Sequence, residues 1–227
     1  MRAAAAQPHS DTMPFAVRPL GAGDVQQSSE VERDAFPTLF PPTPFRRELK
    51  KDNVSFLVAW RREPAHQDLS APGTPGRRGG LLGTLSKSTR GMVGGPPLPG
   101  GQDFITGILG TWYMVDEAHI ISVGVRTAFR GWGIGELLLI AAIEQAMGRQ
   151  ASVVTLEVRP SNTAAINLYH KYGLTERGLR KRYYADNRED ALIMTTDPIQ
   201  HPDYRDLFLE QEREHRRRWG HAERIVH

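Results

Sequence analysis

The fold is decided by residues 123–139, which read VGVRTAFRGWGIGELLL. An apolar stretch leads into a turn that holds Gly131, Gly133 and Gly135, and a second apolar run follows the turn. Glycine permits close backbone approach and positive φ, so several N–H groups can converge on one anion. A helix that begins at the turn adds about half a positive charge at its N-terminus. The stretch therefore predicts a strand, a phosphate-binding turn and a helix in succession.

Two other phosphate-binding patterns fit this turn less well. A dinucleotide fingerprint needs glycine at its first, third and sixth positions, and the sixth position counted from Gly131 is Glu136. Glu157 follows Gly135 by 22 residues, near the place of a ribose-binding acid, so this alternative stays open. A P-loop is excluded because the chain has no Gly-Lys-Ser or Gly-Lys-Thr. A glycine-rich connection without any ligand is the remaining alternative.

Composition limits the class of protein further. The chain has 227 residues, a formal net charge of +3 and no cysteine. This length suits one domain with extensions. The lack of cysteine excludes a disulfide scaffold and a cysteine nucleophile. No apolar run approaches the roughly 20 residues that cross a bilayer, and the first residues are too short for a signal peptide. We therefore expect a soluble, cytoplasmic protein.

Residues 61–103 differ in composition from the rest of the chain. They hold ten glycines and six prolines, which predicts a disordered insertion within the domain. They also carry six basic against three acidic residues, which is the whole charge excess of the chain. A globally basic nucleic-acid binder is therefore not supported. A tolerated surface insertion is the simpler interpretation, and a weak RNA contact through its charge is the alternative.

Hydrophobic patterning predicts strands and helices in alternation, and thus an α/β or α+β sheet with helices packed on it. The predicted strands are 15–20, 54–60, 105–115, 119–125, 152–158, 174–182 and 191–196. The predicted helices are 24–36, a short one from Pro44, 134–147, 162–172 and 203–219. We expect a flexible tail at 1–13, one domain over 14–200 and a charged, helical C-terminal tail at 201–227.

Four ordered blocks of sequence are typical of one enzyme family. They are RGWGIG at 130–135, LEVR at 156–159, SN at 161–162 continued by AAINLY at 164–169 and YGL at 172–174, and RYY at 182–184 with EDALIM at 189–194. With these blocks, residues 119–196 resemble the core of the GNAT acetyltransferases, in particular the RimI-type bacterial ribosomal-protein alanine N-acetyltransferases. The segment AFP at 35–37 resembles a substrate-side motif of the same branch.

This resemblance implies a fold and a reaction. The fold is a mixed, mostly antiparallel sheet with flanking helices, splayed between its fourth and fifth strands to admit acetyl-CoA. The reaction is direct attack of an amine on the thioester of acetyl-CoA, without an acyl-enzyme and without a metal. The absence of cysteine agrees with direct attack, because no thiol is present to carry an acetyl group. The implied acceptor is a protein N-terminal α-amino group, that of a ribosomal protein.

The resemblance also implies which residues hold acetyl-CoA. The strand end would pair its main chain with the pantetheine, the glycine turn would hold the pyrophosphate, and Asn162 would contact the cofactor. The residues of the strand end and the turn are Val123, Gly124, Val125, Arg130, Gly131, Trp132, Gly133, Ile134, Gly135 and Glu136. From sequence alone, Asn162 is nearly as well explained as a plain helix N-cap.

Two residues are the candidates for proton transfer. Glu157, late in the apolar strand, would take the proton of the acceptor ammonium. Tyr169 would protonate the leaving thiolate, since a phenol with a pKa near about 10 is close in acidity to a thiol. The alternatives are a solvent-facing Glu157 and a Tyr169 that only packs in the core. His119 is expected to open a strand and to bind nothing.

The acceptor side is the least certain part of the site. Tyr183 and Tyr184 resemble the paired aromatics that line it in protein N-terminal acetyltransferases, although such a pair can also stabilise a sheet edge. Phe36 and Pro37 are candidates for the opposite wall. Three other functions stay open: acetylation of other N-termini, lysines or small amines, a non-catalytic acetyl-CoA-binding module, and an RNA-associated scaffold that uses the insertion and residues 216–218.

Overall fold

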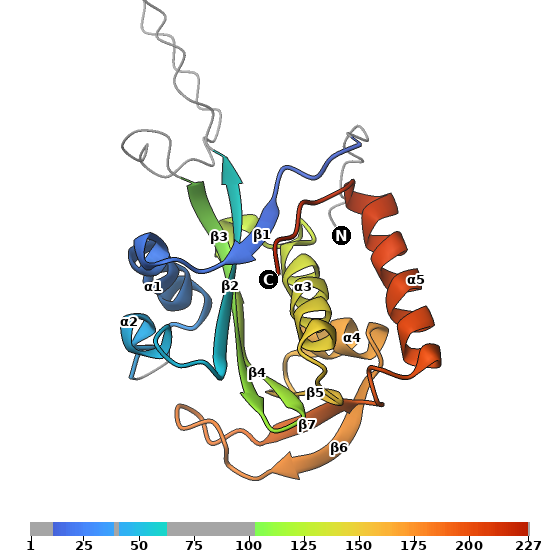
Figure 1. Ribbon diagram of the computed structural model, residues 1–227. Helices are drawn as coiled ribbons and strands as arrows, with labels where there is room; N and C mark the ends of the chain where they lie inside the picture. Colours follow the sequence, from blue (N-terminus) through green and yellow to red (C-terminus); the bar gives the residue numbers. More distant parts are fainter. Residues whose placement is uncertain (1–10, 39–40, 63–102, 227) are drawn as a thin grey trace, which may run out of the picture.

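The computed structural model describes residues 11–38, 41–62 and 103–226 (Figure 1). Within them, seven strands form one sheet in the order β1-β2-β3-β4-β5-β7-β6. The strands are β1 (Ala16–Pro19), β2 (Val54–Arg62), β3 (Asp103–Met114), β4 (Glu117–Val125), β5 (Val153–Val158), β6 (Leu174–Arg180) and β7 (Ala191–Thr196). Among the strand pairs of this sheet, β4 and β5 pair in parallel and the other pairs are antiparallel. The predicted mixed, mostly antiparallel α/β sheet is confirmed.

Helices cover both faces of the sheet. They are α1 (Val25–Ala35), α2 (Phe45–Glu48), α3 (Ile134–Gly148), α4 (Thr163–Lys171) and α5 (Pro202–Trp219), with 3-10 turns η1 (Ala22–Asp24) and η2 (Thr127–Phe129). Figure 1 shows α1 and α2 on one face, α3 on the other, and α5 on the outer side of α3. Across the described ranges, no helix combines the length and the apolar character that a bilayer crossing requires.

Alternating side chains on the strands build one core on each face. In β2, Phe56 and Val58 belong to a cluster with Val31 of α1, whereas Leu57 and Ala59 belong to the larger cluster around α3. Successive residues of a strand point to opposite faces, so this apolar run serves both layers. The sheet is therefore buried on both sides where the two clusters overlap.

Helix α3 is buried around its whole circumference. Every residue from Leu137 to Ile143 is at most 2% exposed. An amphipathic surface helix would leave one face polar, and a helix that is apolar all round must be covered on both sides. The sheet covers one side, and α5 covers the other with Tyr204, Phe208 and His215, which are buried.

The sheet opens between β4 and β5. Their pairing ends at Ile120 and Leu156, so the ends of the two strands diverge. The register of β3 against β4 also shifts after Gly110, beside the point of divergence. A Cβ on Gly110 would lie only 2.7 Å from Cε1 of Phe56, so glycine is required there. The splay expected between the fourth and fifth strands is confirmed, although residues 119–120 and 153–156 still pair.

The structure corrects three expected boundaries. Arg61 and Arg62 end β2 and pair with Phe104 and Asp103 of β3, so they are strand residues and not part of an insertion. The rest of the expected insertion, 63–102, lies outside the described residues.

The two ends of the chain differ from the expected flexible tail at 1–13 and from the expected end of the domain at residue 200, although the expected C-terminal helix is present as α5. Residues 1–10 are not described, but Met13 donates its N–H to the carbonyl of His221, and His221 donates to Asp11. Residues 202–226 pack against α3 and contribute buried side chains to the main core. The C-terminal segment is therefore a layer of the domain, and its burial follows from the apolar outer face of α3.

Candidate active site

The glycine turn before α3 has the backbone that an anion site needs. Gly131 and Gly133 have φ of 82° and 75°, a region that favours glycine. The N–H of Leu137 donates to the carbonyl of Gly133 at 2.9 Å, and no side chain caps the helix before it. The N–H groups that precede Leu137 have no intrahelical acceptor and point out of the helix end. This backbone fits a phosphate group, as the sequence predicted.

The side chains of the turn offer fewer groups for binding a phosphate than its backbone does. Arg130 is exposed, and its Nε donates to the carbonyl of Val125 at 3.4 Å. Trp132 is 39% exposed and meets the ring of Phe15 edge to face at 6.3 Å. Ile134 is buried in the core. Only the main chain of Ile134 can therefore face a ligand.

The carboxylate of Glu136 is directed toward α4. Its Oε1 accepts from Nζ of Lys171 at 2.7 Å and from the hydroxyl of Tyr172 at 2.9 Å. This side chain links α3 to α4 and holds the helix start against its neighbour. A role for Glu136 in binding the cofactor would therefore come from its N–H in the first turn of α3.

The open end of β4 lies beside the turn. Residues 123–125 pair on one side with residues 107–109 of β3, and β5 has already diverged on the other side. A Cβ on Gly135 would lie 3.7 Å from Cγ2 of Val125, so the strand end and the start of α3 are adjacent. The expected pantetheine strand and pyrophosphate turn thus form one continuous surface.

Phe36 lies against the middle of this strand end. A Cβ on Gly124 would be 3.0 Å from Cε2 of Phe36 and 3.0 Å from Cβ of Ala35. A larger residue at position 124 would therefore require the end of α1 to shift away from the strand. Pro37 follows on the exposed side of Phe36. The two predicted wall residues are therefore beside the open strand, at the end of α1.

Glu157 lies on β5 just beyond the last pair with β4, and its side chain is 8% exposed. Its Oε2 is 2.7 Å from Nε2 of His119, and its Oε1 accepts from Nε of Arg180 at 2.8 Å. The alternative of a solvent-facing Glu157 is thus excluded. A carboxylate has about four lone-pair sites, so two partners leave it able to accept a proton.

Sequence reasoning missed His119 as a site residue. The strand begins at Glu117 and not at His119, and His119 is in register with Thr155 of β5. Side chains two residues apart on a strand share a face, so Glu157 is the next residue on the face that Thr155 occupies. The contact between His119 and Glu157 follows from the parallel register of β4 and β5, and no local sequence pattern encodes that register.

Tyr169 is buried in α4, and burial, with a smaller contribution from Tyr184, raises its pKa to about 12. The expected value near 10 is therefore too low. Burial likewise raises the pKa of Tyr184 to about 12, and the charge of Glu157 contributes to that shift. The charge of Tyr184 contributes in turn to the raised pKa of Tyr169.

The paired tyrosines lie on the loop between β6 and β7. Their rings meet at 5.2 Å, nearly perpendicular, and Tyr183 is 49% exposed. The guanidinium of Arg159 lies 3.7 Å from the ring centre of Tyr184 and is 2.9 Å from Asp186. Hydrogen bonds from Arg159 lower the pKa of Asp186 to about 2. The loop is therefore fixed by charge as well as by ring contacts.

One hydrogen bond joins the two expected acceptor walls. Oγ1 of Thr38, directly after Pro37, donates to Oδ2 of Asp186 at 2.8 Å. The segment after α1 and the β6–β7 loop are far apart in sequence, yet they meet here. The segment that carries Phe36 and Pro37 therefore meets the loop that carries Tyr183 and Tyr184.

Asn162 acts as a helix cap. Its Oδ1 accepts from the N–H of Ala165 at 3.2 Å at the start of α4. This is the plainer of the two interpretations, and contact with a cofactor stays a prediction. No group of three or more metal-ligating side chains occurs in the part of the chain that the structure describes.

A solved structure has the same fold. The crystal structure of the ribosomal-protein-S18-alanine N-acetyltransferase from Escherichia coli aligns with a TM-score of 0.55, at 22% identity, over 82% of this chain and 94% of that one. At this identity the match shows the fold alone. That fold is the GNAT fold, with its open sheet beside a helix N-terminus.

Sequence comparison then gives the family. Residues 91–174 match the Acetyltransferase (GNAT) family. The chain is 31% identical over 191 residues to a Mycobacterium tuberculosis protein named N-alpha-acetyltransferase RimI, a match that covers 83% of this chain and 96% of that protein. The chain therefore belongs to the GNAT family of acetyltransferases.

A second relative is more similar over a shorter stretch. The Escherichia coli protein named [Ribosomal protein bS18]-alanine N-acetyltransferase is 40% identical over 86 residues, which cover 37% of this chain and 58% of that protein. The matched stretch thus spans less than two thirds of that relative. Both relatives are named as N-acetyltransferases.

Proposed function

We propose that the protein transfers the acetyl group of acetyl-CoA to the α-amino group of a protein N-terminus, that of a ribosomal protein. The observation that carries this proposal is the fork of β4 and β5, which opens beside the uncapped start of α3 and has Glu157 at its base. Two relatives named for N-terminal or bS18-alanine acetylation support the acceptor class. A cytoplasmic location follows from such an acceptor.

The cofactor would lie along the backbone already described. The N–H groups from Gly131 to Glu136 would hold the diphosphate, and the open edge of residues 123–125 would pair with the pantetheine. When bound, acetyl-CoA supplies an activated acetyl group as a thioester. A main-chain N–H of the strand end would polarise the thioester carbonyl, as in an oxyanion hole. The turn and the strand end are adjacent, which supports a single extended binding mode.

Glu157 would act as the general base. It accepts a proton from the acceptor ammonium, and the free amine then attacks the acetyl carbon directly. His119 and Arg180 each hold one oxygen of this carboxylate, so they are positioning residues that keep its remaining lone pairs directed at the acceptor. The new N–C bond forms as the C–S bond breaks, and the nitrogen then releases a second proton to solvent, so that the amide product is neutral.

Tyr169 would donate a proton to the departing thiolate. Because burial raises its pKa to about 12, the phenol is protonated at every physiological pH and is available as a donor. It is also a weaker acid than an ordinary tyrosine. Its main contribution is therefore a hydrogen bond to the developing charge on sulfur. The pKa of the phenol is further above that of a thiol than the sequence analysis expected, so proton transfer to the thiolate is less favourable.

The acceptor peptide would enter between the two walls joined by Thr38 and Asp186. Phe36 and Pro37 form one wall, and Tyr183 and Tyr184 form the other. Half-exposed aromatic rings offer apolar contact area while their polar edges stay solvated. This combination suits an extended peptide end better than a small polar amine.

The proposal is tested by incubating the purified protein with acetyl-CoA and purified ribosomal proteins, followed by mass spectrometry of N-terminal peptides. We expect one acetyl group on the α-amine of a ribosomal protein, and at least about 100-fold slower product formation with Glu157→Gln at equal enzyme concentration. Acetylation confined to lysines or small amines would contradict the acceptor assignment. Tight binding of CoA without turnover on any amine would favour a non-catalytic module.

A further inference from the structure

The C-terminal helix contacts the glycine turn directly. His215 of α5 is 2% exposed, and its Nε2 lies 3.1 Å from the carbonyl oxygen of Gly133. The same oxygen accepts the first hydrogen bond of α3, from Leu137. Burial lowers the pKa of His215, so the ring is neutral at neutral pH. Because its partner is a carbonyl, Nε2 carries the hydrogen and donates.

Trp219, one turn further along α5, packs on the same residue. A Cβ on Gly133 would lie 2.6 Å from Nε1 and 2.7 Å from Cε2 of Trp219. The indole therefore occupies the space that any side chain at position 133 would need. Gly133 is held from one side by a hydrogen bond to its carbonyl and from another by an indole ring.

The segment after α5 fixes the helix in this position. Arg224 pairs with Glu144 of α3 at 2.7 Å and with Glu212 of α5 at 3.1 Å. Gln145 of α3 donates to the carbonyl of Val226 at 3.0 Å. Figure 1 shows this segment returning from the end of α5 toward β1. The contacts at Gly133 therefore belong to a helix that is tied to α3 along its length.

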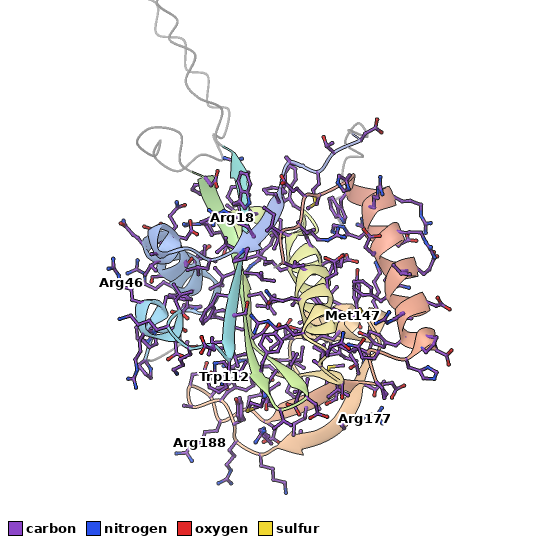
Figure 2. All side chains as sticks on the ribbon, in the orientation of Figure 1. Arg18, Arg46, Trp112, Met147, Arg177 and Arg188 are labelled. Carbon is purple, nitrogen blue, oxygen red and sulfur yellow. The ribbon has the colours of Figure 1, made fainter. Side chains whose placement is uncertain are left out.

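The opposite end of α5 packs on the end of α4. There the hydroxyl of Tyr204 donates to the carbonyl of Tyr172 at 3.0 Å. Phe208 and Leu209 line a groove together with Met147. Figure 2 shows Met147 near the end of α3. His215 follows Tyr204 by eleven positions on the helix, which is about 16 Å at the usual rise per residue. One helix thus offers both a test residue and a matched control.

We infer that His215 and Trp219 are positioning residues for coenzyme A, and that α5 completes the diphosphate site by holding Gly133 in the conformation that aims the N–H groups of the turn at the phosphates. This inference rests on the proposed function and names the element that sets cofactor affinity. An anion site made of backbone donors depends on their preorganisation, so loosening Gly133 weakens binding without touching the ligand.

The test is calorimetric titration of the full chain with coenzyme A. His215→Leu removes the donor at similar volume and is expected to weaken binding about tenfold, whereas His215→Gln keeps a donor and stays within about twofold of wild type. Trp219→Ala is expected to weaken binding by a similar factor. The matched control Tyr204→Phe removes a buried hydrogen bond of the same helix and leaves the affinity for coenzyme A unchanged.

Steady-state kinetics separate positioning from a loss of stability. For His215→Leu and Trp219→Ala, the KM for acetyl-CoA rises while kcat and the KM for the acceptor stay near wild type. If His215→Leu does not fold, as judged by circular dichroism, the comparison of Trp219→Ala with Tyr204→Phe decides the question.

Two negative results have different meanings. Wild-type protein that binds no coenzyme A overturns the proposed function, and the inference with it. Wild-type protein that binds coenzyme A, with His215→Leu and Trp219→Ala binding as tightly as Tyr204→Phe, overturns the inference alone.

Discussion

The proposed cofactor side and the proposed acceptor side of the site are built in different ways. The cofactor side is a contiguous piece of backbone, residues 123–136, whose shape comes from glycines at positive φ and from a helix start. The acceptor side is assembled from the end of α1 and the β6–β7 loop, which meet through Thr38 and Asp186. The first is therefore encoded locally, and the second depends on contacts between distant segments.

This difference separates two kinds of specificity. A backbone anion site recognises a diphosphate through main-chain groups that every residue type supplies. Walls made of aromatic rings and ion pairs can change with single substitutions. We therefore expect variants of the two sides to affect the two substrates separately.

The largest expected effect lies between the two sides, at Glu157. Glu157→Gln keeps the shape of the side chain but cannot take the proton of the acceptor ammonium. We expect kcat to fall by about 10²–10⁴-fold, as for removal of other general bases. Steady-state assays give kcat, and calorimetry is expected to show unchanged affinity for coenzyme A. A loss of cofactor affinity instead would place Glu157 on the cofactor side.

The next largest effect is expected on the cofactor side. Gly133→Ala forces a side chain onto a residue with φ of 75° and against the ring of Trp219. Such backbone strain costs about 1–3 kcal/mol, so we expect the KM for acetyl-CoA to rise by about 5- to 100-fold.

Gly148→Ala is the matched control for this substitution. It lies at the other end of α3, where a Cβ would have no neighbour within 4 Å. Because alanine favours a helix, we expect Gly148→Ala to leave the KM unchanged and to raise stability by about 0.5–1 kcal/mol. Equal kinetics for the two variants would contradict the importance of the Gly133 backbone.

A smaller effect is expected for Tyr169→Phe. Loss of the hydrogen bond to the leaving sulfur should lower kcat by about tenfold, measured at saturating substrates. Since the pKa of this phenol is raised to about 12, it stays protonated as pH rises to about 11. The shape of the pH–rate profile of wild type and variant should therefore agree up to about pH 10. A basic limb that disappears in Tyr169→Phe would contradict this.

Buried tyrosines also predict how stability depends on alkaline pH. A phenol whose folded pKa is raised keeps its proton while the unfolded chain loses it, so stability is complete below about pH 10 and falls as pH rises toward 12. Chemical denaturation at several pH values measures this loss. Tyr169→Phe should show a shallower decline than wild type, and an identical slope would contradict burial of this phenol.

The smallest effect is expected on the acceptor side. Asp186→Asn weakens the pairs with Arg159 and Thr38, so the KM for the acceptor should rise a few-fold while the KM for acetyl-CoA is unchanged. The matched control is Asp197→Asn, which breaks an exposed pair with Arg177 and should change neither constant. A change in the KM for acetyl-CoA would contradict the separation of the two sides.

The ion pair of Asp186 with Arg159 also determines over which pH range the acceptor side keeps its structure. The pKa of Asp186 is lowered to about 2, so its pairing is complete above about pH 4 and is lost only as pH falls through about 2. The KM for the acceptor should therefore not depend on Asp186 titration in assays above pH 5.

Local sequence predicted most of the fold and the cofactor side. The strands and helices follow from apolar periodicity, and the turn at Gly131 and Gly133 follows from backbone freedom. The sequence also held an unused signal. The run from Leu137 to Ile143 is apolar on every face, which requires a covering layer, and α5 is that layer.

The remaining features depend on register and long-range contact. His119 meets Glu157 only because β4 and β5 pair in parallel at one register. Thr38 meets Asp186 across most of the chain. Such contacts are decided by packing of the whole sheet. Neither the contact of His119 nor that of Thr38 could therefore be predicted from the neighbouring sequence.

The most direct test of the account is a crystal structure of the protein with coenzyme A. The account predicts the diphosphate within hydrogen-bond distance of the N–H groups of residues 131–136, the pantetheine along residues 123–125, and the sulfur between Glu157 and Tyr169. A diphosphate bound elsewhere, or a sulfur remote from both side chains, would contradict it.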